Sequence, residues 1–223
     1  MEEFNSDVIY EVKNQNHFII KTFYRMFLGL LATAFAAFYT YKSGIYMQIP
    51  YGVLAIVELA VVLIFSFLFK KLSPTVVTIL FFAYAFINGA TFGVIFAIYD
   101  MSTISLAFFA TSILFGGLAF YGYKTNKDIT KFGTILLVAL IVGLIVSIIN
   151  LFIGSELIDI ALDWAIILIF CGYTAYDMNK IKRLQMEVDS DEEKLYVYGA
   201  MELYLDFINL FLRILRILGR RRS

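Results

Sequence analysis

Long apolar runs separated by short polar connections recur along the whole chain. Each run approaches or exceeds the ~20 residues that an α-helix needs to cross a bilayer. Because the connections are short, we expect the helices to pack as neighbours in a single domain. The pattern predicts an all-α membrane protein with seven transmembrane helices, at about 21–42, 51–70, 75–99, 103–123, 133–153, 157–180 and 195–217. These helices form one domain at 20–218, flanked by a polar N-terminal tail at 1–19 and a basic C-terminal tail at 219–223.

The composition supports a chain whose solvent is lipid. Of the 223 residues, 61% are hydrophobic, and the mean hydropathy is +0.82, which is beyond what a soluble domain carries. The formal net charge is zero, so no overall field attracts nucleic acid. Cys171 is the single cysteine, which excludes an internal disulfide and a cysteine metal site. Heavy use of isoleucine, phenylalanine, tyrosine and lysine indicates an AT-rich bacterial genome.

The lysines and arginines of the connections predict the orientation. They gather after the second, fourth and sixth segments, whereas the connections after the other segments carry only Lys42. Cytoplasmic loops are enriched in these residues, so we expect the N-terminus of this integral protein in the cytoplasm, at a bacterial plasma membrane. Seven crossings then place Arg220, Arg221 and Arg222 outside, against the rule. We favour a full crossing, and a last segment that re-enters instead of crossing is the alternative.

Two aspartates interrupt the last two apolar segments. Asp177 lies within 157–180 and Asp206 within 195–217. A carboxylate at such a depth costs several kcal/mol to bury as an anion, or it must be neutralised. Two acids on consecutive segments therefore suggest a site for protons or cations.

A polar stripe runs along the last segment. Its members follow one another at intervals of three or four residues, so at 3.6 residues per turn they lie on one helix face. In lipid, such a face turns toward the centre of the bundle. We therefore expect the last helix to be surrounded by the other six. The stripe consists of Tyr198, Glu202, Asp206, Asn209, Arg213 and Arg216.

The chemistry of the two aspartates suggests a pH sensor that also binds ions. Two carboxylates in a low dielectric cannot both ionise cheaply, and sharing one proton lowers that cost. When both are ionised they repel each other, and their oxygens can accept a hard cation such as calcium. Supporting roles are assigned to Glu202, Asn209, Glu58 in the second segment, and Arg213 as a counter-ion. The alternative is that these groups only form hydrogen bonds between helices.

Three stretches resemble one known family, the transmembrane Bax-inhibitor-motif family, and in particular its bacterial members. The similarity covers nearly the whole chain in order. In the middle of the chain it lies in Gly122-Tyr123-Lys124-Thr125-Asn126-Lys127-Asp128, Gly133 and Asn150-Leu151-Phe152. Near the end it lies in Tyr176-Asp177 and in the stretch Leu203-Tyr204-Leu205-Asp206-Phe207-Ile208-Asn209-Leu210-Phe211.

The resemblance implies a seven-helix fold with the last helix in the centre and a pH-sensitive calcium leak. It assigns the pH-sensing aspartate pair to Asp177 and Asp206. In some members an arginine within the second span partners the pair. The second segment of this chain has no arginine, and its basic residues are Lys70 and Lys71 at its end. Bacterial members are also associated with a membrane-bound AAA protease as modulators.

Calcium leak through the bilayer, gated by the aspartate pair, is accordingly the predicted function. A proton-coupled cation exchanger and a regulatory partner of a membrane protease remain as alternatives. An intramembrane aspartyl protease is disfavoured, since Tyr204-Leu205-Asp206 stands where those enzymes need Gly-x-Gly-Asp. We expect no enzymatic activity and no cofactor, with calcium and protons as the ligands.

Overall fold

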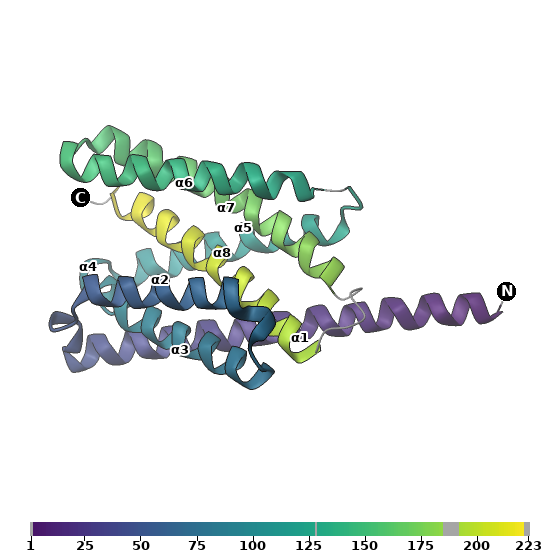
Figure 1. Ribbon diagram of the computed structural model, residues 1–223. Helices are drawn as coiled ribbons and strands as arrows, with labels where there is room; N and C mark the ends of the chain where they lie inside the picture. Colours follow the sequence, from purple (N-terminus) through teal and green to yellow (C-terminus); the bar gives the residue numbers. More distant parts are fainter. Residues whose placement is uncertain (1, 128, 185–191, 221–223) are drawn as a thin grey trace. The chain divides into compact units, whose positions relative to one another are not determined.

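The computed structural model describes residues 2–127, 129–184 and 192–220, which are almost entirely helical. Figure 1 shows the helices coloured along the sequence. The α-helices are α1 (Glu2–Ser43), α2 (Tyr51–Leu68), α3 (Pro74–Phe92), α4 (Ile95–Ile98), α5 (Met101–Lys124), α6 (Thr130–Ile153), α7 (Glu156–Leu184) and α8 (Glu192–Arg220), and two 3₁₀ turns are η1 (Ile45–Met47) and η2 (Phe69–Lys71).

The all-helical fold is confirmed, and six helical stretches of the described chain are long and apolar enough to cross a membrane. They are Asn16–Ser43, Tyr51–Leu68, Pro74–Ile98, Met101–Lys124, Thr130–Ile153 and Glu156–Leu184. The first six predicted segments correspond to them. The seventh, α8, is as long as α7 but carries the predicted polar stripe, so its composition does not identify it as a span in the same way.

Short polar sequences fix where the helices begin and end. The Ser73 hydroxyl accepts a hydrogen bond from the backbone N–H of Val76 at 3.4 Å, and Pro74 follows at the first helical position of α3. Asp100 caps α5 by accepting from the backbone N–H of Thr103 at 2.9 Å. Gly154 ends α6 at φ 70°, a left-handed conformation that favours glycine.

The described parts of both predicted tails belong to the neighbouring helices. The polar stretch predicted at 1–19 is helical from Glu2 and continuous with the first span as α1. At the other end, α8 includes Gly219 and Arg220 of the stretch predicted at 219–223. Arg221, Arg222 and Ser223 lie outside the described residues.

Apolar side chains cover the outward faces of the spans. In α2, Phe65 is buried but Phe67 is 79% exposed, and in α6, Asn150 is buried but Phe152 is 89% exposed. Exposure of this kind would be costly in water. In a bilayer it is contact with acyl chains, and the driving force for packing comes from close helix contacts and polar partners.

Residues 20–218, predicted as one domain, fall into two compact units that each contain part of α7 and of α8. Unit 1 comprises Met1–Ile98 and Ile181–Tyr204. In unit 1, α3 approaches α1 closely: a Cβ at Gly89 would lie 2.4 Å from the Thr33 carbonyl oxygen. The close approach of small residues is how helices associate in lipid.

Unit 2 comprises Tyr99–Lys180 and Leu205–Ser223. Its α5 and α7 touch backbone to backbone, since a Cβ at Gly122 would lie 2.2 Å from the carbonyl oxygen of Ala175. On α8, Phe207 packs edge-on against Phe108 and Phe115 of α5, with ring centroids 5.6 and 5.5 Å apart. These contacts position α7 and the second part of α8 for the site described below.

Two glycines of α5 provide a matched test of this packing. We expect Gly122→Ala to destabilise the protein by about 1–3 kcal/mol, because the new methyl group meets backbone that cannot move aside. Gly116→Ala is the control, since nothing lies within 4 Å of a Cβ there, and alanine should stabilise the helix by about 0.5–1 kcal/mol. Thermal unfolding in detergent measures both variants, and equal midpoints would contradict the close α5–α7 contact.

Candidate functional site

Both predicted aspartates are buried within unit 2. Asp177 on α7 is 7% exposed, and Asp206 on α8 is 3% exposed. Neither therefore faces the acyl chains. This burial is what the sequence predicts for functional acids in a membrane, because a carboxylate in lipid without partners is prohibitively costly.

Tyr173 brings the two aspartates into one electrostatic environment. Asp177, Asp206 and Lys180 all act electrostatically on the Tyr173 hydroxyl. Tyr173 lies one helical turn before Asp177 on α7. Both acids and Lys180 are thus within electrostatic reach of this tyrosine.

Residues of the family-like stretches hold this turn in place. Gly122 admits the backbone at Ala175, and a Cβ at Gly133 would lie 2.5 Å from the ring of Tyr176. The buried amide of Asn179 donates to the carbonyl oxygens of Gly122 at 3.3 Å and Thr125 at 3.2 Å. The residues just before and just after Asp177 in the chain are therefore held by contacts to α5 and α6.

The predicted stripe on α8 is less uniform than the sequence suggests. Asp206 is buried, Glu202 and Asn209 are half-buried, and Arg216 is exposed. Asn209 donates to the carbonyl oxygen of Leu205 at 2.8 Å, a bond within its own helix. Apolar residues on the other faces, such as Leu203 and Leu210, are fully buried. The polar face is thus not the only buried face of α8.

Glu58, the predicted supporting acid of the second segment, lies in unit 1. Its carboxylate accepts a hydrogen bond from the Thr91 hydroxyl at 3.1 Å, which joins α2 to α3. Thr91 also donates to the carbonyl oxygen of Asn88 at 2.7 Å. Glu58 therefore belongs to a polar contact between α2 and α3.

A second polar group of unit 1 centres on the buried residue Tyr204, to which the sequence assigns no role in packing. Its hydroxyl lies 2.6 Å from the Thr33 hydroxyl of α1 and donates to the Asn88 side chain of α3 at 3.4 Å. Tyr204 and Thr33 are 171 residues apart in the chain. No local pattern can reveal such a pairing.

A heavily charged group of unit 2 is also not predicted from the sequence. Asp163 of α7 is fully buried and faces three arginines of α8. Arg213 contacts it at 2.9 Å, Arg216 at 3.3 Å and Arg220 at 3.4 Å. Arg220 also lies 4.0 Å from Asp159. Arg213, assigned by sequence as a counter-ion of the aspartate pair, is thus placed against Asp163.

One sequence signal could have identified this group. Asp163 is an acid within the apolar run 157–180, just as Asp177 is, and an ionisable residue inside a span calls for a named partner. The spacing of Arg213, Arg216 and Arg220 places them on one face of α8. Their pairing with Asp163 follows once α7 and α8 are taken as antiparallel.

Among the residues that the structure describes, no group of three or more histidine, cysteine, aspartate or glutamate side chains is arranged to hold a metal ion. A calcium ion at Asp177 and Asp206 would therefore need oxygen ligands other than carboxylates, since calcium takes 6–8 of them. Calcium binding by the pair stays a prediction.

Comparison with known proteins agrees with the family-like stretches. Residues 15–223 match the family described as inhibitor of apoptosis-promoting Bax1. The inner membrane protein YbhL of Escherichia coli K12 is 39% identical over 207 residues, which is 88% of each chain. An uncharacterized protein of Borreliella burgdorferi is 33% identical over 96% of each chain. An uncharacterized membrane protein of Streptococcus pyogenes serotype M3 is 33% identical over 97% of this chain and 99% of its own.

Asp163 offers a stability test of the charged group. We expect Asp163→Asn to lower stability by on the order of 3 kcal/mol, because three arginines lose the carboxylate that they share. The matched control is Asp159→Asn, whose half-exposed side chain lies 4.0 Å from Arg220 and should matter by about 1 kcal/mol or less. Unfolding midpoints in detergent measure both variants, and a neutral Asp163→Asn would show that the ion pairs do not stabilise unit 2.

Proposed function

Since the chain belongs to the family of inhibitors of apoptosis-promoting Bax1, we propose that this membrane protein is a pH-sensitive calcium leak channel gated by Asp177 and Asp206. The observation that carries the proposal is the burial of both acids beside Tyr173 in unit 2. Two buried carboxylates in one environment favour a shared proton, and losing it creates a repelling, cation-binding pair. Proton release thereby couples directly to helix position and to ion binding.

Lys180 is the proposed counter-ion of this pair. The chain has no arginine in α2, and Arg213 is engaged by Asp163. Lys180 follows Asp177 by three residues, so both side chains lie on the same face of α7. Its positive charge acts on Tyr173 together with both aspartates. We assign it the role that an arginine of the second span has in some relatives.

The proposed architecture has seven crossings with α8 inside the bundle. Along α8, only Glu192, Glu193 and Arg216 are exposed among the described residues, which supports a helix enclosed by others. Within unit 2, Asp206 acts on Tyr173 while Arg220 reaches Asp159 near the start of α7. The stretch of α8 from Asp206 to Arg220 therefore follows α7 for ~21 Å in the antiparallel direction, which supports a full crossing.

The proposed location is the bacterial plasma membrane, with the N-terminus in the cytoplasm. Basic residues at the ends of α2, α5 and α7 support this orientation. Lys70 and Lys71 follow α2, Lys124 is the last residue of α5, and Lys182 and Arg183 lie in the last turn of α7. The names of two relatives, an inner membrane protein and a membrane protein, agree with a membrane location.

The gating role is tested by calcium flux in proteoliposomes across pH 5 to 8. We expect Asp177→Asn and Asp206→Asn each to flatten the pH dependence, because an asparagine cannot exchange the shared proton. Glu156→Gln is the matched control, since it removes an exposed carboxylate of the same helix as Asp177. If both asparagine variants keep the wild-type profile, the gating assignment is wrong. Calcium flux driven by an imposed pH gradient would identify a proton-coupled exchanger instead.

The counter-ion role predicts a shift in the same pH profile. Without the positive charge of Lys180, ionising the carboxylates becomes harder, so it requires a higher pH. We therefore expect Lys180→Gln to move the midpoint of the flux profile to higher pH. Lys131→Gln, which removes an exposed lysine at the start of α6, should leave the midpoint in place. A midpoint shared by both variants and the wild type would exclude Lys180 as the counter-ion.

A further inference from the structure

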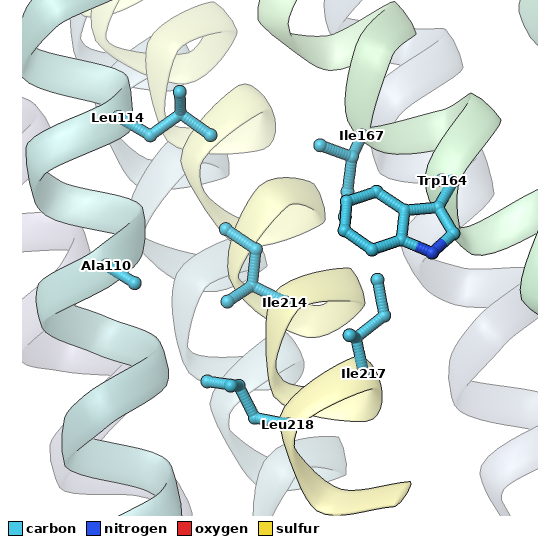
Figure 2. Close-up of a pocket in the computed structure, with 7 residues that line it drawn as sticks. All are labelled: Ala110, Leu114, Trp164, Ile167, Ile214, Ile217 and Leu218. Carbon is cyan, nitrogen blue, oxygen red and sulfur yellow. The ribbon is translucent and has the colours of Figure 1, made fainter. Parts of the chain in front are cut away.

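An apolar groove opens beside the arginines of unit 2. It has a volume of about 300 Å³, which is at the lower end of the range for ligand pockets. Helices α5, α7 and α8 all contribute to it, as Figure 2 shows. Of the seven side chains that line it, only the indole of Trp164 carries a polar atom. The lining includes Ala110, Leu114, Trp164, Ile167, Ile217 and Leu218.

The groove and the arginines occupy the same two turns of α8. Ile217 and Leu218 line the groove, while Arg216 and Arg220 flank them in the sequence and face Asp163. On α7 the two features are adjacent as well, because Trp164 directly follows Asp163. The apolar groove and the arginines therefore lie side by side.

The charges of this group do not cancel. Three guanidinium groups face Asp163 and, at longer range, Asp159. Asp159 also accepts a hydrogen bond from the Asn150 side chain at 2.8 Å. Arginine is always protonated in proteins, so in the described contacts of this group three positive charges face two negative ones. The Arg216 side chain is 45% exposed, which leaves it accessible to a ligand.

The group lies toward one end of the span. Asp163 lies seven residues after the start of α7, or about 10 Å along the helix, and long arginine side chains at this depth can extend toward the headgroups. Tryptophan is enriched where a bilayer meets water, and Trp164 is 52% exposed at this level. The groove therefore begins near the headgroups and is lined by side chains that suit an acyl chain.

From these features we infer that unit 2 binds an anionic glycerophospholipid, with its phosphate at Arg216 and Arg220 and one acyl chain in the groove. Guanidinium groups suit phosphate because their planar N–H donors match its oxygens in pairs. A phosphatidylglycerol headgroup presents one negative charge without the ammonium group of phosphatidylcholine, which the arginines would repel.

Lipid binding to the purified full-length protein tests the inference. Native mass spectrometry from detergent counts bound lipids, and the thermal midpoint is followed as dioleoylphosphatidylglycerol is added. We expect saturable binding of about one lipid per chain and a rise in the midpoint. Dioleoylphosphatidylcholine should bind more weakly, and inorganic phosphate alone should not reproduce the stabilisation because it leaves the groove empty.

Three variants separate the headgroup site from the groove. Arg216→Gln should raise the half-saturating concentration of phosphatidylglycerol about fivefold, the effect of one basic residue near a membrane surface. Ala110→Phe should weaken binding by filling the groove. Trp164→Leu also changes the groove lining and should weaken binding to a smaller degree. The matched control is Arg25→Gln, which removes an arginine of unit 1 that pairs with Glu193 at 3.1 Å.

Several outcomes would overturn the inference. Equal binding of phosphatidylglycerol and phosphatidylcholine would mean that lipids only coat the protein. Stabilisation by phosphate alone that survives Ala110→Phe would identify a simple anion site. Loss of binding in Arg25→Gln to the same degree as in Arg216→Gln would indicate a general charge effect. None of these results depends on calcium flux, so the proposed leak stands or fails separately.

Discussion

The hydrocarbon core of a bilayer supplies no hydrogen-bond partners, and a charged group buried at that depth must therefore find its partner within the protein. This constraint explains why Arg213, Arg216 and Arg220 gather at Asp163 rather than spreading over α8. It also explains why polar residues of unit 1 meet in compact groups. Thr33 and Tyr204 share a hydrogen bond, and Glu58 accepts one from Thr91. Where lipid offers no hydrogen-bond partners, the pairing of polar residues determines which helix faces pack together.

The two acidic sites of unit 2 show how differently one residue type can be used. Asp163 contacts three arginines, which are always cations, and acts as a structural anchor. Asp177 and Asp206 share their surroundings with a tyrosine and a lysine instead. In the function that we propose, these two acids exchange the proton.

The spans and the two predicted acids could be found from the sequence because both depend on local features. Apolar length locates the helices, and a carboxylate within an apolar run marks Asp177 and Asp206. Tyr204 and Asp163 could not be assigned in this way, because their roles depend on residues from other helices that only the folded register brings near. Asp206 of the predicted stripe is buried, and so are apolar residues on the other faces of α8, such as Leu203.

The contact of Gly122 with the carbonyl oxygen of Ala175 has a mechanical consequence for unit 2. A contact between two backbones cannot adjust by a change of side-chain rotamer, so α5 and α7 are held at a fixed distance at this point. The links between α7 and α8 near Asp163 run instead through long arginine side chains, which can swing and still keep their carboxylate. If a protonation event near Asp177 moves a helix, we expect α8 to move and α7 to stay in place against α5.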